Sequence, residues 1–458
     1  MIPPHIIPPE NVSAGLRSFR DAMTCVIRVW PRQVYEGDFY RPPLPGFLLV
    51  MNEDAIRQVM IDDADQFPQA EATLRLLRPI WREGIAASTG DAWRWQRRAA
   101  APAFTPKSAG LVVPFAETAA YRLAGRWRRE GGAVEITSGF ADAVTQVVFD
   151  AFLATHGDEP DRAAFSHWGD QLTNEMERLN LADVFQLPKW TRPFLGPTLR
   201  KPAAALHKIA ARILSASRNT AEPAPLLHLL ASSKDPESGR EMSAGRLEDN
   251  IAGALAGGRE TTALALSWAL WLVAQHRATQ DRLRREIAEA RLDGPLQAPD
   301  LARVPFARQV LLEALRLYPP APQIARQCIR DTRLGTVDVR KGTLVIIPIY
   351  ALHRHRRYWT DPDAFEPERF APDRLDPRES RYRFMPFGGG DRICLGMHFA
   401  LTEAQTMLIT LLREHEVAPD PDAAPPELVV GSTLRAKNGL RLVFSPSLCR
   451  RPDTDSHV

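Results

Sequence analysis

A glycine-rich segment that contains one cysteine constrains this chain more than any other feature. The segment reads Phe-Met-Pro-Phe-Gly-Gly-Gly-Asp-Arg-Ile-Cys-Leu-Gly and ends at Gly396. Its three consecutive glycines, 388–390, allow backbone angles that are closed to other residues and let a flat ligand approach. Cys394 stands just before a helical pattern, where free backbone N–H groups and the helix dipole favour a thiolate. Arg392 can pair with an anion.

A buried structural cysteine in a turn is the ordinary alternative for this segment. Cys394 is surrounded by glycines, an arginine and the start of a helix. A cysteine that only packs in the core would not need these neighbours, so a thiolate that binds a metal is favoured. Because the segment offers one cysteine, the metal must bring most of its own ligands. Haem does this, and cysteine thiolate is a known axial ligand of haem iron.

The run from Phe387 to Gly396 resembles the haem-binding signature of the cytochrome P450 family, F-x-x-G-x-R-x-C-x-G. The match is to a soluble, bacterial-type haem-thiolate monooxygenase that binds haem b (iron protoporphyrin IX). The resemblance implies that Cys394 is the proximal iron ligand and that Arg392 pairs with a haem propionate. It also implies that Phe387 packs near the sulfur and that Gly388 and Gly396 contact the cofactor.

A second motif, Glu313-Ala-Leu-Arg316, lies within an apolar helical pattern. A spacing of three places both charges on one helix face. A surface ion pair is the ordinary alternative and would stabilise little, but the apolar neighbours indicate burial and a need for full pairing. The motif resembles the E-x-x-R helix of the family. The resemblance implies a structural network of Glu313 with Arg316 and Arg369 that retains the haem.

The segment Gly257-Gly-Arg-Glu-Thr-Thr lies in the middle of a long predicted helix. Glycine there costs about 1 kcal/mol relative to alanine, so the pattern indicates a kink beside a ligand or close packing through small residues. It resembles the oxygen-activation motif of the family, [A/G]-G-x-[D/E]-T. The resemblance implies that Gly257 lies against the cofactor site, that Thr261 hydrogen-bonds oxygen or its water, and that Glu260 relays protons, which is general acid work.

Arginines recur where a haem would need partners for its propionates. Trp93 and Arg97 are four residues apart and resemble the W-x-x-x-R helix of the family, although an amphipathic surface helix also fits the pattern. Arg326 lies in an extended, proline-rich segment. The resemblance implies that all three contact the propionates, since charge-assisted pairing favours arginine at such sites. His353 and His355 lack acidic or cysteine partners at ligand spacing, which disfavours a second metal site.

Helical spacing of apolar residues dominates the chain, and strand patterns are short. The spacing predicts helices over 118–130, 204–218, 245–276, 278–290, 307–318 and 397–415, and strands over 47–51, 342–349 and 440–444. Residues 221–245 are expected to form a loop, and residues 356–383 a long irregular segment. The resemblance implies the cytochrome P450 fold: one mainly α-helical domain over 1–458, with small β-sheets, that encloses the haem. Residues 1–20 and 447–458 are expected to be extended or frayed.

Composition excludes several other classes of protein. The 458 residues are 45% hydrophobic and 25% charged, as in an ordinary globular protein. Lys and Arg number 58 against 55 Asp and Glu, a net charge of +3 that gives no argument for nucleic-acid binding. Four scattered cysteines do not build a disulfide scaffold. Neither an export signal nor a membrane anchor is recognisable, so a cytoplasmic monomer is expected.

The resemblance implies monooxygenation, in which one atom of O₂ enters a hydrophobic organic substrate by hydroxylation. Electrons would come from a separate ferredoxin with an NAD(P)H-dependent reductase. Basic residues near the cysteine face are expected to dock an acidic ferredoxin, although a merely solvated basic face is an equal alternative. These residues are Arg94, Arg98, Lys107, Arg381 and Arg383.

The predicted substrate pocket is apolar and carries few charges. By analogy with the family its residues are Leu77, Ile80, Trp81, Ile85, Ala254, Leu255, Ile324 and Thr433. Two other functions compete with monooxygenation. A peroxygenase driven by H₂O₂ would not need the Glu260–Thr261 pair. A non-catalytic haem-binding or sensor protein would not need the oxygen-activation motif on the helix over 245–276.

Overall fold

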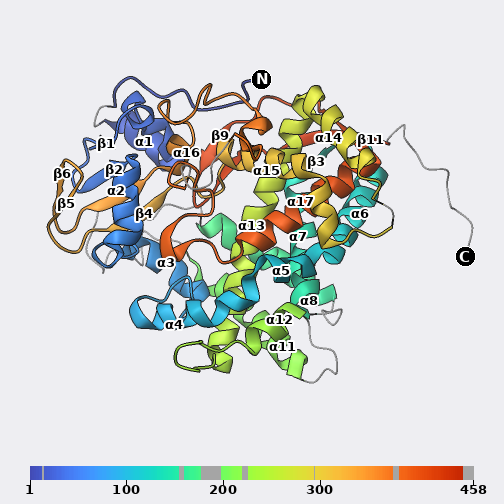
Figure 1. The fold of residues 1–458 in the computed structure, drawn as a ribbon, viewed down its shortest axis with the longest axis horizontal. Helices are drawn as coiled ribbons and strands as arrows, with labels where there is room; N and C mark the ends of the chain where they lie inside the picture. Colours follow the sequence, from blue (N-terminus) through green and yellow to red (C-terminus); the bar gives the residue numbers. More distant parts are fainter. Residues whose placement is uncertain are drawn as a thin grey trace, which may run out of the picture.

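The computed structural model describes residues 1–12, 15–153, 159–176, 198–218, 225–292, 294–374 and 381–446. Helices make up most of it, and the short strands lie in separate groups, one at the left of Figure 1 and another at its upper right. The α-helices are α1 (Leu16–Thr24), α2 (Glu53–Arg57), α3 (Glu71–Trp81), α4 (Gly90–Ala100), α5 (Pro106–Ala109), α6 (Val113–Glu130), α7 (Ile136–Leu153), α8 (Glu159–Met176), α11 (Arg200–Arg218), α12 (Pro225–Ala231), α13 (Ala244–Gln275), α14 (Arg277–Glu289), α15 (Pro305–Leu317), α16 (Ile349–Leu352) and α17 (Met397–Glu414).

Four small sheets flank these helices in the described part of the chain. A four-stranded sheet has the order β1-β2-β7-β4, in which β2 runs parallel to β7 and Phe47 faces Leu344. A three-stranded sheet has the order β3-β11-β8, and β5–β6 and β9–β10 form two-stranded antiparallel pairs. The strands are β1 (Phe39–Tyr40), β2 (Phe47–Val50), β3 (Ala133–Glu135), β4 (Ile324–Gln327), β5 (Thr332–Leu334), β6 (Val337–Val339), β7 (Leu344–Ile347), β8 (His415–Pro419), β9 (Leu428–Val430), β10 (Leu434–Ala436) and β11 (Arg441–Pro446).

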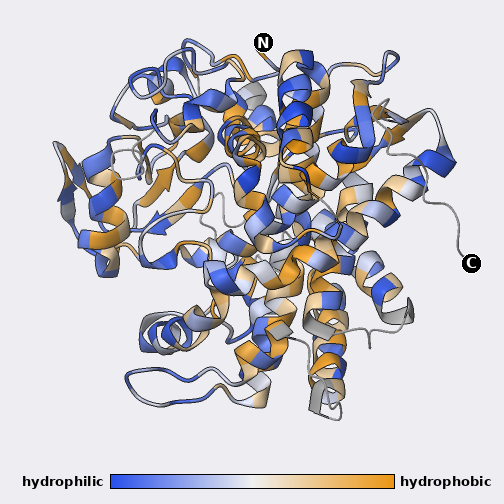
Figure 2. Ribbon diagram, turned by 45° about the vertical axis from the view of Figure 1, so that its right-hand side comes forward, coloured by the Kyte–Doolittle hydropathy of each residue, from blue (hydrophilic) through white to orange (hydrophobic). Residues whose placement is uncertain are grey.

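Helix α13 is the central element of the fold. The Ser243 side chain accepts a hydrogen bond from the Arg246 N–H and caps its start. Every residue from Thr262 to Ala274 is buried, as expected of a helix that is apolar on all sides. Helices α3, α7, α11, α14, α15 and α17 pack on it. Apolar residues concentrate on these central helices (Figure 2).

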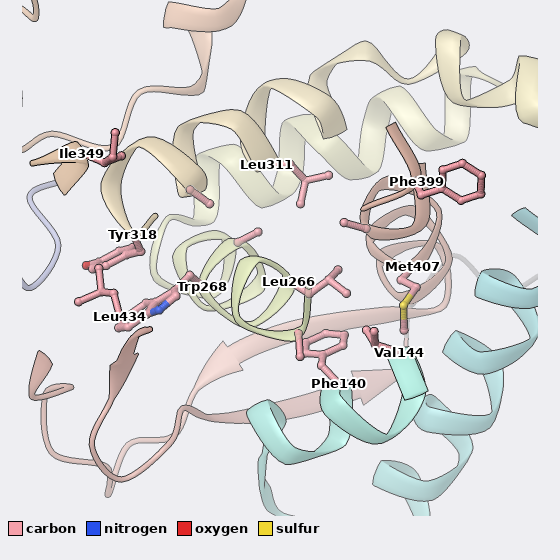
Figure 3. Packing of buried hydrophobic residues seen from close by; sticks show 14 of the residues in the cluster. Phe140, Val144, Leu266, Trp268, Leu311, Tyr318, Ile349, Phe399, Met407 and Leu434 are labelled. Carbon is pink, nitrogen blue, oxygen red and sulfur yellow. The ribbon is translucent and has the colours of Figure 1, made fainter. Parts of the chain in front are cut away.

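Close packing fills the space between α13 and its neighbours. Figure 3 shows Leu266 of α13 among Phe140 of α7, Leu311 of α15 and Met407 of α17. All four residues belong to one cluster of buried hydrophobic side chains. Protein interiors of this density hold their side chains in fixed positions. The core therefore gives α13 a rigid backbone from which its central residues act.

The helical and strand patterns of the sequence are confirmed for most of the predicted elements. The six predicted helices appear as α6, α11, α13, α14, α15 and α17, and the three predicted strands as β2, β7 and β11. The predicted irregular segment contains one short 3₁₀ turn, Pro367–Phe370, among its described residues. Residues 375–380 and 447–458 lie outside the described part of the chain.

Two expectations were wrong. Residues 221–245 are not all loop, because α12 occupies Pro225–Ala231 and buries Leu226, Leu227 and Leu230. Apolar burial outweighed the local proline and serine signals there. The N-terminal 20 residues are not all extended, because α1 begins at Leu16. The preceding segment is held by tertiary contacts, one of which runs from the Tyr318 hydroxyl to the Pro4 carbonyl at 2.7 Å.

Burial of Glu403 on α17 predicts a loss of stability as the pH rises toward about 8. Its side chain is buried, its Oε1 has no hydrogen-bond partner among the described residues, and burial raises its pKa from 4.5 to about 8. In the folded protein Glu403 therefore stays protonated up to a pH of about 8, whereas in the unfolded chain it loses its proton above a pH of about 4.5. Stability must fall as the pH rises between these two pKa values, by up to about 1.4 kcal/mol per pH unit.

Glu403→Gln should remove this slope, since the amide keeps the shape of the side chain and cannot ionise. Urea unfolding between about pH 5 and about pH 8 would measure it. The control is Glu414→Gln at the half-exposed end of α17, which should leave the slope unchanged. An identical slope in Glu403→Gln and the parent protein would contradict the expectation.

Candidate active site

The cysteine segment forms a rigid loop before α17. The Cys394 N–H donates to the Phe387 carbonyl at 2.9 Å and closes the loop. Gly388 and Gly390 have φ angles of 75° and 65°, in the region that favours glycine. A side chain at Gly390 would also place its Cβ 2.2 Å from the Met60 carbonyl oxygen. These glycines are therefore required by the loop, as the sequence predicts.

The Cys394 side chain exposes surface, but protein atoms crowd the thiol closely. Burial raises its pKa, while the Gly396 N–H and the Arg97 charge lower it to a smaller extent. For the thiol itself, desolvation therefore outweighs the stabilisation of a thiolate that is expected at a helix start. A metal would resolve this balance, since a coordinated thiol is deprotonated outright.

Three partly buried guanidinium groups, those of Arg97, Arg326 and Arg392, lie beside the cysteine loop and form no ion pair with an acidic side chain of the described residues. Burial lowers the pKa of Arg97, and it lowers those of Arg326 and Arg392 to about 10. The charges of Arg326 and Arg97 lower the pKa of Arg392 further. Within the described residues no carboxylate forms an ion pair with any of the three. Uncompensated buried cations are costly, so the cluster fits an anionic group such as the haem propionates.

Two neutral contacts fix the direction of Arg392. One of its nitrogens donates to Gln69 Oε1 at 2.8 Å and another to the Ser88 carbonyl at 3.0 Å. The guanidinium lies 4.3 Å from the centre of the Trp93 ring, which identifies a cation–π contact. The predicted partners Trp93 and Arg392 are thus brought together. Gln69 was missed, because it belongs to no motif.

The predicted contacts of Glu313 with Arg316 and Arg369 are present, and the Glu313–Arg316 pair is fully buried. Arg316 donates two hydrogen bonds to the Glu313 carboxylate, at 2.7 and 2.8 Å, and both side chains are 0% exposed. Arg369 Nε lies 3.5 Å from the same carboxylate. Arg316 also donates to the Pro362 carbonyl at 2.6 Å. The network therefore ties α15 to the irregular segment that precedes the cysteine loop.

His353 connects this network to the cysteine loop. Its Nε2 accepts a hydrogen bond from the Met385 N–H at 2.8 Å, so Nδ1 carries the proton and faces the Arg316 carbonyl at 3.3 Å. Burial first, and then the Arg316 charge, lower its pKa to about 3, which keeps the ring neutral. The described residues hold no cluster that could bind a second metal. Sequence reasoning rejected a metal role for His353 but missed this link.

Hydrogen bonds from hydroxyl groups orient Glu260 and Thr261, the residues of α13 that the sequence assigns to the oxygen-activation motif (below, the distal residues). Thr261 Oγ1 donates to the Gly257 carbonyl at 2.8 Å. The Glu260 carboxylate accepts from Thr433 Oγ1 at 2.7 Å and from Thr173 Oγ1 at 3.1 Å. Thr173 lies near the end of α8 and was missed by the sequence, whereas Thr433 was expected in the substrate pocket. Glu260 therefore has a fixed orientation beside Thr261.

Apart from Thr433, which is buried and donates to Glu260, the predicted pocket residues separate into two groups. Leu77, Trp81, Ile85, Ala254 and Ile324 are partly exposed, so they can contact a ligand. Ile80 and Leu255 are both 0% exposed and belong to the hydrophobic core. A lining role for these two was wrong in this conformation, because a side chain without exposed surface touches only protein.

Fold and site together define a haem protein in which one cysteine supplies the protein ligand to iron. The family model described as cytochrome P450 matches residues 45–442, and the chain belongs to this family. It is a haem-thiolate monooxygenase that binds haem b, uses O₂ and requires a redox partner.

Curated relatives agree with this assignment. The chain is 26% identical over 436 residues to the protein LUTEIN DEFICIENT 5, chloroplastic, of Arabidopsis thaliana, a match covering 87% of this chain and 70% of the relative. It is 29% identical over 438 residues to cytochrome P450 4F3 of Mus musculus, covering 88% and 81%. These relatives are from a plant and a mammal, so they do not support the bacterial type. Among the described residues no helix is long and apolar enough to cross a membrane.

Proposed function

We propose that this chain hydroxylates a hydrophobic organic substrate with electrons from a separate ferredoxin system. The observation that carries the proposal is the pairing of Thr261 with the carbonyl of Gly257 beside a fixed Glu260 carboxylate. Haem supplies the activation of O₂ when it is bound. Cys394 would hold the iron, and the partly buried Arg97, Arg326 and Arg392 would pair with the propionates.

The polar residues of α13 suit proton delivery. The Thr261 hydroxyl can hold a proton at Oγ1, and the neighbouring carboxylate can take one up from solvent and pass it on. General acid catalysis of this kind accelerates reactions by about 10²–10⁴-fold. A peroxygenase would not need this pair, which favours the use of O₂.

The partly exposed pocket residues support a hydrophobic substrate. Leu77, Ile85, Ala254 and Ile324 offer apolar surface, and none of them can hold a charge. Binding sites for small apolar molecules are lined mainly by such side chains, with few polar groups. A terpenoid, an aromatic compound or an alkyl chain fits this surface.

The basic residues expected to dock a ferredoxin are only partly available. Arg94 pairs with Asp65 and Asp91, Arg98 pairs with Asp235, and Arg383 pairs with Glu53. Paired charges steer a partner weakly, since their fields cancel at a distance. Lys107 and Arg381 form no ion pair with any of the described residues, and we propose these two members of the expected set as the contacts of an acidic ferredoxin.

Thr261→Ala tests the proposed function. The haem-loaded protein, reconstituted with a ferredoxin and an NAD(P)H-dependent reductase, should consume NAD(P)H but form product less efficiently by about tenfold or more, with the electrons recovered as hydrogen peroxide. Thr261→Ser keeps the hydroxyl and should restore most of the coupling. Product per NAD(P)H and peroxide would be measured together.

Three results would contradict the proposal. Unchanged coupling in Thr261→Ala would remove the role of the hydroxyl. Turnover with peroxide alone at the rate of the ferredoxin system would favour a peroxygenase. No NAD(P)H-driven oxidation over a broad panel of hydrophobic substrates would favour a haem-binding or sensor protein.

A further inference from the structure

The side chain of Trp81 lies in a notch on α13 formed by Gly253 and Gly257. A Cβ atom added at Gly253 would lie 2.1 Å from Trp81 Nε1 and 2.2 Å from its Cδ1. A Cβ atom added at Gly257 would lie 3.4 Å from Trp81 Cζ2. The indole ring therefore contacts the helix where the two glycines leave room for it. With a side chain at Gly253, the ring could not stay in this position.

This glycine notch is directly adjacent to the distal residues. Gly253, Gly257 and Thr261 follow one another at intervals of four, which places them along one stripe of a helix. Thr261 is also joined to the notch, because its hydroxyl donates to the Gly257 carbonyl at 2.8 Å. The Trp81 ring thus ends about one helical turn before the catalytic hydroxyl.

The segment after Trp81 is fastened to the first turns of α13. Arg82 has a φ of 39°, a rare conformation for a residue with a side chain, and its guanidinium lies 3.4 Å from Glu248. The Glu83 N–H donates to Asp249 at 3.2 Å, and the Ile85 N–H donates to Asn250 at 2.8 Å. These contacts fix the distance of Trp81 from α13, so the ring is positioned by the structure on both sides.

We propose that Trp81 is a specificity-determining residue that limits the size of the substrate group admitted beside Thr261. The inference rests on the proposed function and deepens it. Trp81 is partly exposed, and so are Leu77 on its own helix and Ala254 next to the notch. A large, flat ring that fills the glycine notch blocks the space along α13 that a bulky substrate would otherwise use. Smaller apolar groups reach the Thr261 region without displacing it.

The test compares the binding of iron-coordinating probes of increasing size to the haem-loaded protein. Imidazole, phenylimidazole and naphthylimidazole are titrated, and their dissociation constants are measured from the shift of the haem absorption band. Trp81→Ala should tighten binding of the naphthyl probe relative to imidazole by about tenfold or more. Trp81→Phe should give an intermediate change, and it serves as the informative variant where Trp81→Ala loses haem.

A second substitution tests the notch itself. Gly253→Ala must displace the indole. When Trp81 is present, it should therefore change the ratio of the dissociation constant of naphthylimidazole to that of imidazole. In the Trp81→Ala background the same substitution should have no further effect on the ratio, because the clashing ring is absent. The matched control is Gly245→Ala in the first turn of α13, where the added Cβ would meet no atom of the described residues within 4 Å. This variant should bind all probes like the parent.

Two results would overturn the inference. The first is a ratio within about twofold of the parent value in both Trp81→Ala and Trp81→Phe. The second is an equal effect of Gly253→Ala with and without Trp81. Probe binding needs no electron donor, so a failure of the proposed monooxygenation leaves this measurement intact. A changed probe ratio without turnover would reject the proposed function alone.

Discussion

Cys394→Ser is expected to abolish the haem-thiolate character of the protein. A serine hydroxyl stays protonated at neutral pH and is a poor replacement for a soft thiolate. The reduced, CO-bound protein should lose the strongly red-shifted Soret band. Monooxygenase activity should fall by more than about 100-fold, since even partners outside the ligand shell of a metal cost 10–100-fold when they are removed.

Cys328→Ser is the matched control for this experiment. Cys328 is buried, and its thiol donates to the Arg330 carbonyl at 2.9 Å, a contact that a serine hydroxyl can keep. Its reduced, CO-bound spectrum should match that of the parent protein. An unaltered Soret band in Cys394→Ser would show that another residue binds the iron, and the assignment of the site would be wrong.

Glu313→Ala is expected to have the largest effect on stability. The substitution leaves the Arg316 charge at 0% exposure without its carboxylate, and the Glu366 N–H loses its acceptor. Removing one partner of a buried ion pair costs about 3–5 kcal/mol, a large part of the stability of an ordinary domain. The haem content of the purified protein should fall with it, because this network holds the segment that leads into the cysteine loop.

Urea unfolding and the haem-to-protein ratio would measure both effects. Glu313→Gln keeps the size of the side chain and should be destabilised less than the alanine variant. The control is Glu368→Ala, which breaks an exposed pair with Arg282 and should cost at most about 1 kcal/mol. A soluble Glu313→Ala protein with full haem content and parental stability would contradict a structural role for the network.

The sequence motifs correctly predicted those contacts that form between residues a few positions apart in the chain. Gly388, Gly390 and Cys394 act within one loop, and their angles and hydrogen bonds are set over a few residues. Glu313 and Arg316 pair within one helical turn. The major helices were predicted for the same reason, since apolar spacing is a local property. The loop expectation over 221–245 failed because burial of α12 depends on the rest of the fold.

The sequence by itself determined the glycine-rich cysteine loop, the Glu313 pair and the helical character of the chain. Only the tertiary structure decided what surrounds them. Thr433 reaches Glu260 across 173 residues, and His353 reaches Met385 across 32. Trp81 meets Gly253 because the turn after α3 is fastened to α13. Such contacts depend on how helices pack in space, and the charge, burial and shape of a site arise only when distant side chains are brought together.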